Sequence, residues 1–235
     1  MRDFLLFIRN ANHKAFCYNS TKSKLSSILV FLLFKLIVFL FISTITFILI
    51  DLEFMFSPNK NPSSLSSSNY KLFLSVLIIG PILEEVLFRS WLRISPRIVA
   101  ILLSILYIVK IAPMIFNQKL FESVQTFFMV AIPGLLIFYF AYKASEKIIS
   151  VKTKEMWNNN RLYLFYGSSI LFGYAHVFNY ETTTNLLLFS PLILLPNIVS
   201  GMFAGYIRIN MGFKYGVLYH AINNAIPLII FKSIM

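Results

Sequence analysis

Ile82-Leu83-Glu84-Glu85-Val86-Leu87-Phe88-Arg89 is a charged segment inside a long apolar run that begins near Leu72. A charge at the centre of a bilayer helix costs roughly 2.5–3.5 kcal/mol, so such residues usually face a bundle interior or a water-filled cavity. On a helix Glu85 and Arg89 are four residues apart and can pair. Glu84 lies about 100° around the axis from Glu85. The segment therefore predicts that Glu84 stays free to act as a base.

Two further apolar segments carry polar groups. One is Phe172-Gly173-Tyr174-Ala175-His176, and the other is His220-Ala221-Ile222-Asn223-Asn224. His220 and Asn224 are four residues apart and share a helix face. We expect three helices to build one buried polar site from Glu84, Glu85, Arg89, His176, His220 and Asn224.

The composition is that of a polytopic membrane protein. Of the 235 residues 58% are hydrophobic and 13% are charged, whereas about 25% charged is usual for a soluble domain. The net charge of +12 does not indicate nucleic-acid binding, because the basic residues lie mostly between apolar segments. The bilayer is the expected partner. The single cysteine, Cys17, excludes an internal disulfide.

The apolar segments predict an all-α transmembrane bundle of about seven spans, within a range of six to eight. They cover residues 25–50, 71–92, 95–111, 122–142, 161–178, 185–207 and 216–230. We divide the chain into residues 1–70, a basic N-terminus with a first anchor and a flexible loop, and residues 71–235, the catalytic membrane domain. Residues 143–161 are expected to form a charged loop.

Basic residues set the orientation of the bundle. Lysines and arginines concentrate in residues 2–24, 89–97, 143–161 and 208–214. The positive-inside rule then places the N-terminus in the cytoplasm and the C-terminus outside. The compact size suggests a bacterial plasma-membrane protein.

Four local features carry expectations of their own. The N-terminal Phe4 to Ile8 segment forms either a short interfacial helix or a poorly ordered basic terminus. Lys35 faces neighbouring helices or snorkels. Gly80-Pro81 bends the second span and frees backbone carbonyls near Glu84. Gly201-x-x-x-Gly205 permits close helix packing.

The motifs Glu-Glu-x-x-x-Arg, Phe-x-x-x-His and His-x-x-x-Asn, in this order on separate apolar helices, resemble the CAAX protease and bacteriocin-processing (CPBP, Abi) family of intramembrane endopeptidases. The resemblance runs from about Leu72 to the C-terminus. It implies a CAAX-protease-like core that hydrolyses a peptide bond of a membrane-associated peptide or lipidated protein. Bacteriocin or peptide maturation and self-immunity are the expected roles if the chain is bacterial.

The resemblance also implies a role for each matched residue. Glu84 would be the general base, and His176 would share the attacking water. His220 and Asn224 would form the oxyanion site. The supporting residues, which would hold the geometry and line the site, are Glu85, Arg89 and Phe172.

Other kinds of chemistry remain open. Glu84, His176 and His220 could bind zinc with one open position, although we favour a glutamate-activated water with no cofactor. A nucleophilic role for Cys17 beside His13 is disfavoured, because both lie in the basic terminus. A non-catalytic protein that binds a transporter or sensor, with a structural polar site, is the alternative function. A proton-coupled transporter is disfavoured by the few spans and the lack of an inverted repeat. The oligomeric state does not follow from the sequence.

Overall fold

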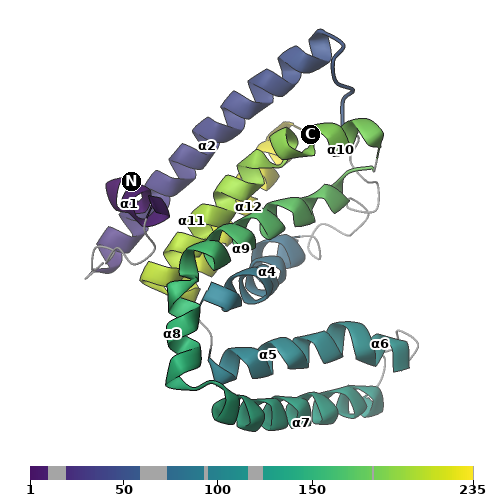
Figure 1. The fold of residues 1–235 in the computed structure, drawn as a ribbon. Helices are drawn as coiled ribbons and strands as arrows, with labels where there is room; N and C mark the ends of the chain where they lie inside the picture. Colours follow the sequence, from purple (N-terminus) through teal and green to yellow (C-terminus); the bar gives the residue numbers. More distant parts are fainter. Residues whose placement is uncertain (10–19, 59–72, 93–94, 116–123, 182, 235) are drawn as a thin grey trace. The chain divides into compact units, whose positions relative to one another are not determined.

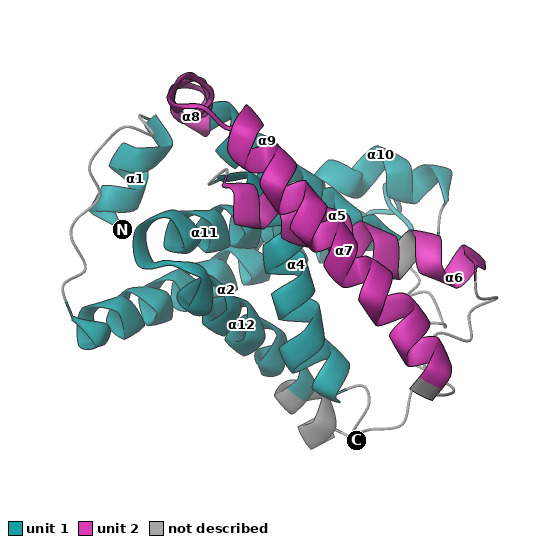
Figure 2. Cartoon of the chain, turned by 90° about the horizontal axis from the view of Figure 1, so that it is seen from below, with its two compact units in different colours: residues 1–92, 162–235 teal, residues 93–161 magenta. Residues whose placement is uncertain are grey.

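The computed structural model describes residues 1–9, 20–58, 73–92, 95–115, 124–181 and 183–234, and these parts are almost entirely helical. The all-α prediction is therefore confirmed. The chain forms two compact units, residues 1–92 with 162–235 and residues 93–161 (Figure 2). The division at residue 70 stays a prediction, because it falls among residues outside the described ranges. His13, Cys17 and the serine-rich segment before Asn69 also lie outside them.

Unit 1 holds the three motifs. Its elements in chain order are α1 (Arg2–Arg9), α2 (Thr21–Asp51), a π-helix (Ser75–Ile79), α4 (Gly80–Arg89), a 3₁₀ turn (Ser90–Leu92), nearly all of α9 (Arg161–Ala175), a 3₁₀ turn (His176–Asn179), α10 (Thr184–Ile193), α11 (Leu195–Met211) and α12 (Phe213–Ile234).

Unit 2 is a pair of apolar helices with short additions. Its elements are α5 (Pro96–Leu106), a π-helix (Tyr107–Ile111), α6 (Ala112–Ile115), α7 (Val124–Ile148) and α8 (Val151–Asn159). Helices α5 and α7 pack along each other, and the Ser104 hydroxyl donates a hydrogen bond to the carbonyl of Gly134. The charged loop predicted for residues 143–161 is wrong, because α7 continues to Ile148 and α8 occupies residues 151–159. Ser150 caps α8 by accepting a hydrogen bond from the Thr153 N–H.

Helix α2 packs on the C-terminal helices of unit 1. Ser20 caps its N-terminus, and its buried residues Ile28, Phe31, Leu32 and Ile42 recur at helical spacing on one face. This face packs on α10, α11 and α12 (Figure 1). Helix α2 and the motifs thus belong to the same compact unit.

The N-terminal segment forms α1, and its apolar face lies in the core of unit 1. Phe4 and Phe7 are buried, and both rings contact Tyr206 of α11. The Tyr166 hydroxyl donates a hydrogen bond of 2.8 Å to the carbonyl of Ile8. Of the two states left open by the sequence, the structure has the helix, packed on protein.

Glycines bring α9 and α11 into close contact. A Cβ atom on Gly201 would lie 3.0 Å from the carbonyl oxygen of Ser169, and one on Gly205 would lie 3.1 Å from the ring of Phe165. The expected packing role of the Gly201-x-x-x-Gly205 pattern is therefore confirmed. On the other side of this contact, a Cβ on Gly173 would meet the backbone nitrogen of Ile198 at 2.9 Å.

The variant Gly173→Ala is expected to destabilise unit 1 by about 1–3 kcal/mol, because the new methyl group overlaps the Ile198 backbone. Gly167→Ala on the same helix is the matched control, since a Cβ there meets nothing within 4 Å. Unfolding of both variants in detergent, followed by tryptophan fluorescence, measures the difference. Equal stability of the two variants would contradict the close contact.

The sixth apolar segment is not one straight span. Helices α10 and α11 meet at an angle of 41° around Leu194. Pro196 in the first turn of α11 lacks the N–H that would continue the helix. Of the described helices, α2 and Gln125–Ile148 are long and apolar enough to cross a membrane, and the bent α10–α11 pair makes a third. The seven-span count therefore stays a prediction.

Candidate active site

Glu84 and His220 meet inside unit 1. The motif helix α4 presents Glu84, and α12 presents His220, whose Nε2 lies 3.2 Å from the Glu84 Oε2 atom. His220 is 3% exposed, whereas the Glu84 side chain is 32% exposed. The two groups form an ion pair when the imidazole is protonated. His220 thereby orients Glu84 while the carboxylate remains accessible.

Glu85 and Arg89 form a separate, fully buried pair. The Arg89 Nε atom lies 3.6 Å from Oε1 of Glu85, as the four-residue spacing predicts. The guanidinium carbon lies 3.8 Å from the centre of the Phe172 ring, a favourable position for a cation. Gly216 of α12 makes room for the carboxylate, since a Cβ there would lie 2.6 Å from the Glu85 Oε2 atom.

The Phe172 ring joins the charged pair to both histidines. It is 2% exposed and lies 4.7 Å from the His176 ring and 5.4 Å from the His220 ring, centre to centre. Both contacts are edge-on, a stable arrangement for aromatic rings. Phe172 therefore fixes the positions of the imidazoles as well as lining the site.

His176 begins the 3₁₀ turn at the end of α9, and its ring is held by its own helix. Its Nδ1 atom lies 2.9 Å from the carbonyl oxygen of Phe172. A carbonyl only accepts, so Nδ1 carries the proton and donates it. In the neutral ring Nε2 is then an acceptor, and His176 is suited to hold a hydrogen of a water molecule.

Asn224 is bound to the backbone of the second span. Its Nδ2 donates a hydrogen bond of 3.1 Å to the carbonyl of Val76. In the π-helix the N–H of Gly80 bonds to Ser75 five residues back. The next bond in that register would join residue 81 to Val76, but Pro81 has no N–H. The Gly80-Pro81 step thus frees the Val76 carbonyl, as expected, and the Asn224 amide donates a hydrogen bond to it.

Replacing Asn224 by Leu is expected to cost about 1–3 kcal/mol of stability, because the Val76 carbonyl is left without a donor. The double variant Asn224→Leu with Pro81→Ala should recover part of this loss, since an alanine in place of the proline supplies a backbone N–H. Unfolding in detergent of the single and double variants forms a double-mutant cycle. Additive effects would contradict the link between Pro81 and Asn224.

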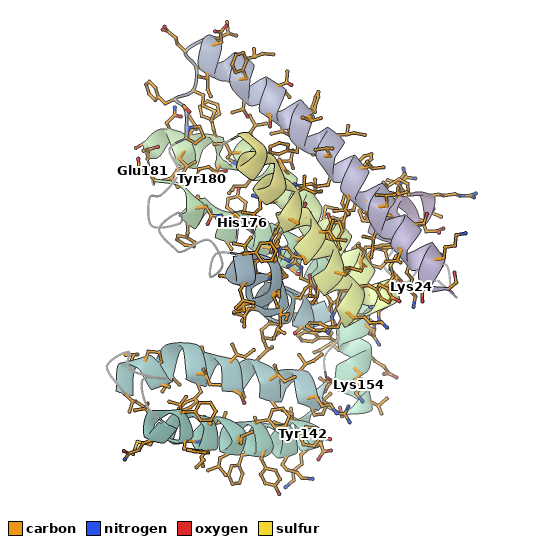
Figure 3. All side chains as sticks on the ribbon, turned by 180° about the vertical axis from the view of Figure 1, so that it is seen from behind. Lys24, Tyr142, Lys154, His176, Tyr180 and Glu181 are labelled. Carbon is orange, nitrogen blue, oxygen red and sulfur yellow. The ribbon has the colours of Figure 1, made fainter. Side chains whose placement is uncertain are left out.

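A cavity of about 210 Å³ adjoins these groups. Four of the residues expected in the site line it, namely Phe172, His176, His220 and Asn224. Figure 3 shows His176 among the helices of unit 1, with Tyr180 further along the chain. The other lining residues come from α2, α10, α11, α12 and the segment after α9; they are Lys35, Phe39, Tyr180, Ile193, Pro196, Asn197, Ser200, Asn223 and Pro227.

A comparison with protein families matches residues 66–226 to the type II CAAX prenyl endopeptidase Rce1-like family. The chain belongs to this family. No curated protein and no solved structure matches it.

The Rce1-like family is a family of membrane proteases. The chain is accordingly an integral membrane protein and an intramembrane protease in this general sense. The matched residues include all seven site residues that the sequence indicated. Lys35 and the whole of α2 precede the matched part.

The zinc alternative requires Glu84, His176 and His220 to converge on one point. Within the described residues, no group of three His, Cys, Asp or Glu side chains is arranged to hold a metal ion. This arrangement gives no support to zinc binding, and the reaction without a cofactor stays a prediction.

Sequence reasoning missed several polar residues of the cavity. Asn197 and Ser200 lie one turn apart on α11, and Asn223 precedes a motif residue. Little in the sequence indicated that these residues line a cavity, because a single Asn or Ser in an apolar helix commonly makes a packing contact. Lys35 had the stronger signal, since a lysine in the middle of a span is costly.

Proposed function

We propose that this Rce1-like protein is an intramembrane endopeptidase in which Glu84 activates the attacking water. The observation that carries the proposal is the pairing of Glu84, whose carboxylate is partly exposed, with His220, which lines the same cavity as His176. A carboxylate next to an imidazole with a free acceptor nitrogen can polarise one water molecule from two sides.

The reaction balances with groups of this chain alone. Glu84 takes a proton from water, and the resulting hydroxide attacks the carbonyl carbon of the scissile amide. The oxyanion that forms needs N–H donors. Asn224 has a second N–H besides the one given to Val76 and is the donor we assign. Glu84 then passes its proton to the leaving nitrogen, and the products are a carboxylic acid and an amine, which ionise to a carboxylate and an ammonium group.

This assignment changes the role of His220. The resemblance implies that His220 and Asn224 share the oxyanion site, yet the Nε2 atom of His220 faces Glu84 at 3.2 Å. We infer that His220 orients the base and stabilises its charge. Glu85 and Arg89 hold α4 in place. Phe172 packs on Arg89 and on both imidazoles, and it thereby fixes their positions.

The setting of the reaction is also a proposal. We infer a bundle of about seven spans with a cytoplasmic N-terminus, in a bacterial plasma membrane. The substrate is a membrane-associated peptide or a lipidated protein, and the name of the family points to prenylated chain ends. In a bacterium, maturation of a secreted peptide or self-immunity fits better.

The test compares processed protein termini in membranes of cells carrying wild type, Glu84→Gln or His176→Ala at matched protein levels. We expect the same precursors to accumulate with both variants and not with wild type. Identical profiles, while deletion of the gene still produces a phenotype, would mean that the polar site is structural. The search would then move to a transporter or sensor that the protein binds.

A further inference from the structure

Lys35 brings a positive charge to the wall of the catalytic cavity. It lies on the packed face of α2, seven residues after Ile28 and seven before Ile42, which are both buried. Its side chain lines the cavity together with His176, His220 and Asn224. Of the two states expected from the sequence, Lys35 therefore faces the neighbouring helices.

Lys35 is too far from the ends of its helix to reach the headgroups. Thr21 and Asp51 are about 21 Å and 24 Å away along the axis, at 1.5 Å per residue. A lysine side chain is much shorter than either distance. Its ammonium group is thus committed to the cavity, where the Phe39 ring lies 5.3 Å away as a partial partner.

No carboxylate of the described residues forms an ion pair with Lys35. Glu84, the carboxylate beside the cavity, is paired with His220, and Glu85 is paired with Arg89. A cation at this depth is stable only beside an anion or in water. The cavity is also lined by Asn197 and Asn223, and the Asn223 Oδ1 atom is buried without a hydrogen-bond partner in the described protein. These polar groups mark a place for a polar ligand.

We propose that Lys35 is a specificity-determining residue whose ammonium group binds a carboxylate of the peptide substrate. The cavity of about 210 Å³ is smaller than common ligand sites of roughly 300–1,000 Å³. The carboxylate bound there therefore lies within a short stretch of peptide from the bond at Glu84. It comes from an acidic side chain or from the free end of the chain.

This inference deepens the proposed function and rests on it, but it concerns a different residue. Lys35 lies outside the part of the chain that matches the Rce1-like family. The proposed charge selection is thus made by a helix that precedes the matched part of the chain.

The test measures binding of a dansyl-labelled farnesyl peptide that ends in Cys-Val-Leu-Ser, with the protein in lipid nanodiscs. The Glu84→Gln variant serves as background so that the probe stays intact. Three forms of the probe are compared: a free carboxyl end, an amidated end, and an amidated end with Glu in place of the final Ser. We expect the free-carboxyl form or the Glu form to bind about 10- to 100-fold more tightly than the plain amide, the range for one charge-assisted contact. The form that binds tightly identifies the source of the carboxylate.

Lys35→Met in the same background should remove this preference, whereas Lys35→Arg should keep it. Lys22→Met is the matched control on the same helix, since Lys22 is exposed near its start. Lys35→Met is expected to fold, because it removes a charge from an apolar helix. Equal binding of all three forms, a preference that survives Lys35→Met, or no binding of any form overturns the proposal.

Cleavage distinguishes this proposal from the one on Glu84. If Glu84→Gln stops processing but binding shows no carboxylate preference, the protease proposal stands and the proposed role of Lys35 is overturned. If the carboxylate preference depends on Lys35 but processing is unchanged in Glu84→Gln, the cavity binds peptides and the glutamate mechanism is refuted.

Discussion

Glu84→Gln is expected to lower kcat of the purified protein in nanodiscs by about 100- to 10,000-fold, the range for loss of a general base. The amide keeps the shape of the side chain and its place beside His220, so KM should change little. The loss then lies in proton transfer and not in substrate binding. Single-turnover cleavage of a precursor identified from the membrane comparison measures it.

Glu146→Gln is the matched control for this prediction. Glu146 is an exposed carboxylate in unit 2, where it pairs with Lys143 at 3.3 Å. The same chemical change there should leave kcat unaltered. Activity of Glu84→Gln within about tenfold of wild type, at equal thermal stability, would refute the assignment of the base.

Arg89→Met is expected to produce the largest loss of stability, about 3–5 kcal/mol, because it leaves the Glu85 carboxylate buried without its cation. The variant also removes the cation from the face of Phe172, and both histidine rings pack on that residue. Unfolding in detergent, followed by fluorescence, measures the change in the free energy of unfolding.

The double variant Glu85→Leu with Arg89→Met separates charge from packing. It removes both buried charges, so it should be more stable than Arg89→Met alone. Its activity should still be low, because Phe172 loses the contact that positions it. A double variant no more stable than Arg89→Met would mean that the pair acts through shape alone.

The sequence contained enough to predict much of the site. The spacing of Glu85 and Arg89 is local to one helix, and their pairing follows from helical geometry. The step at Gly80-Pro81 is likewise local, since a proline always lacks its N–H. The position of His176 could not be derived in this way. In the structure α9 runs from Arg161 to Ala175, and the packing of Phe172 against the His220 ring of α12 brings this end of α9 to the site.

Span boundaries were the least predictable part. Hydropathy alone does not distinguish one straight helix from two bent ones, so the break at Leu194 was missed. Low hydropathy also made residues 143–161 look like a loop, because α8 is mostly polar and has no buried residue. In both places the local hydropathy does not indicate where a helix begins or ends.

By itself the sequence determined that this protein is a helical membrane protein and that three polar motifs lie deep in apolar helices, because charges in such positions are too costly to be accidental. Only the tertiary structure decided which groups meet. It placed Glu84 beside His220, paired the Asn224 amide with the Val76 carbonyl, and brought Lys35 of the first long helix to the wall of the cavity. The first two contacts join residues more than a hundred positions apart, and such partners are set by the packing of whole helices, which no local sequence pattern records.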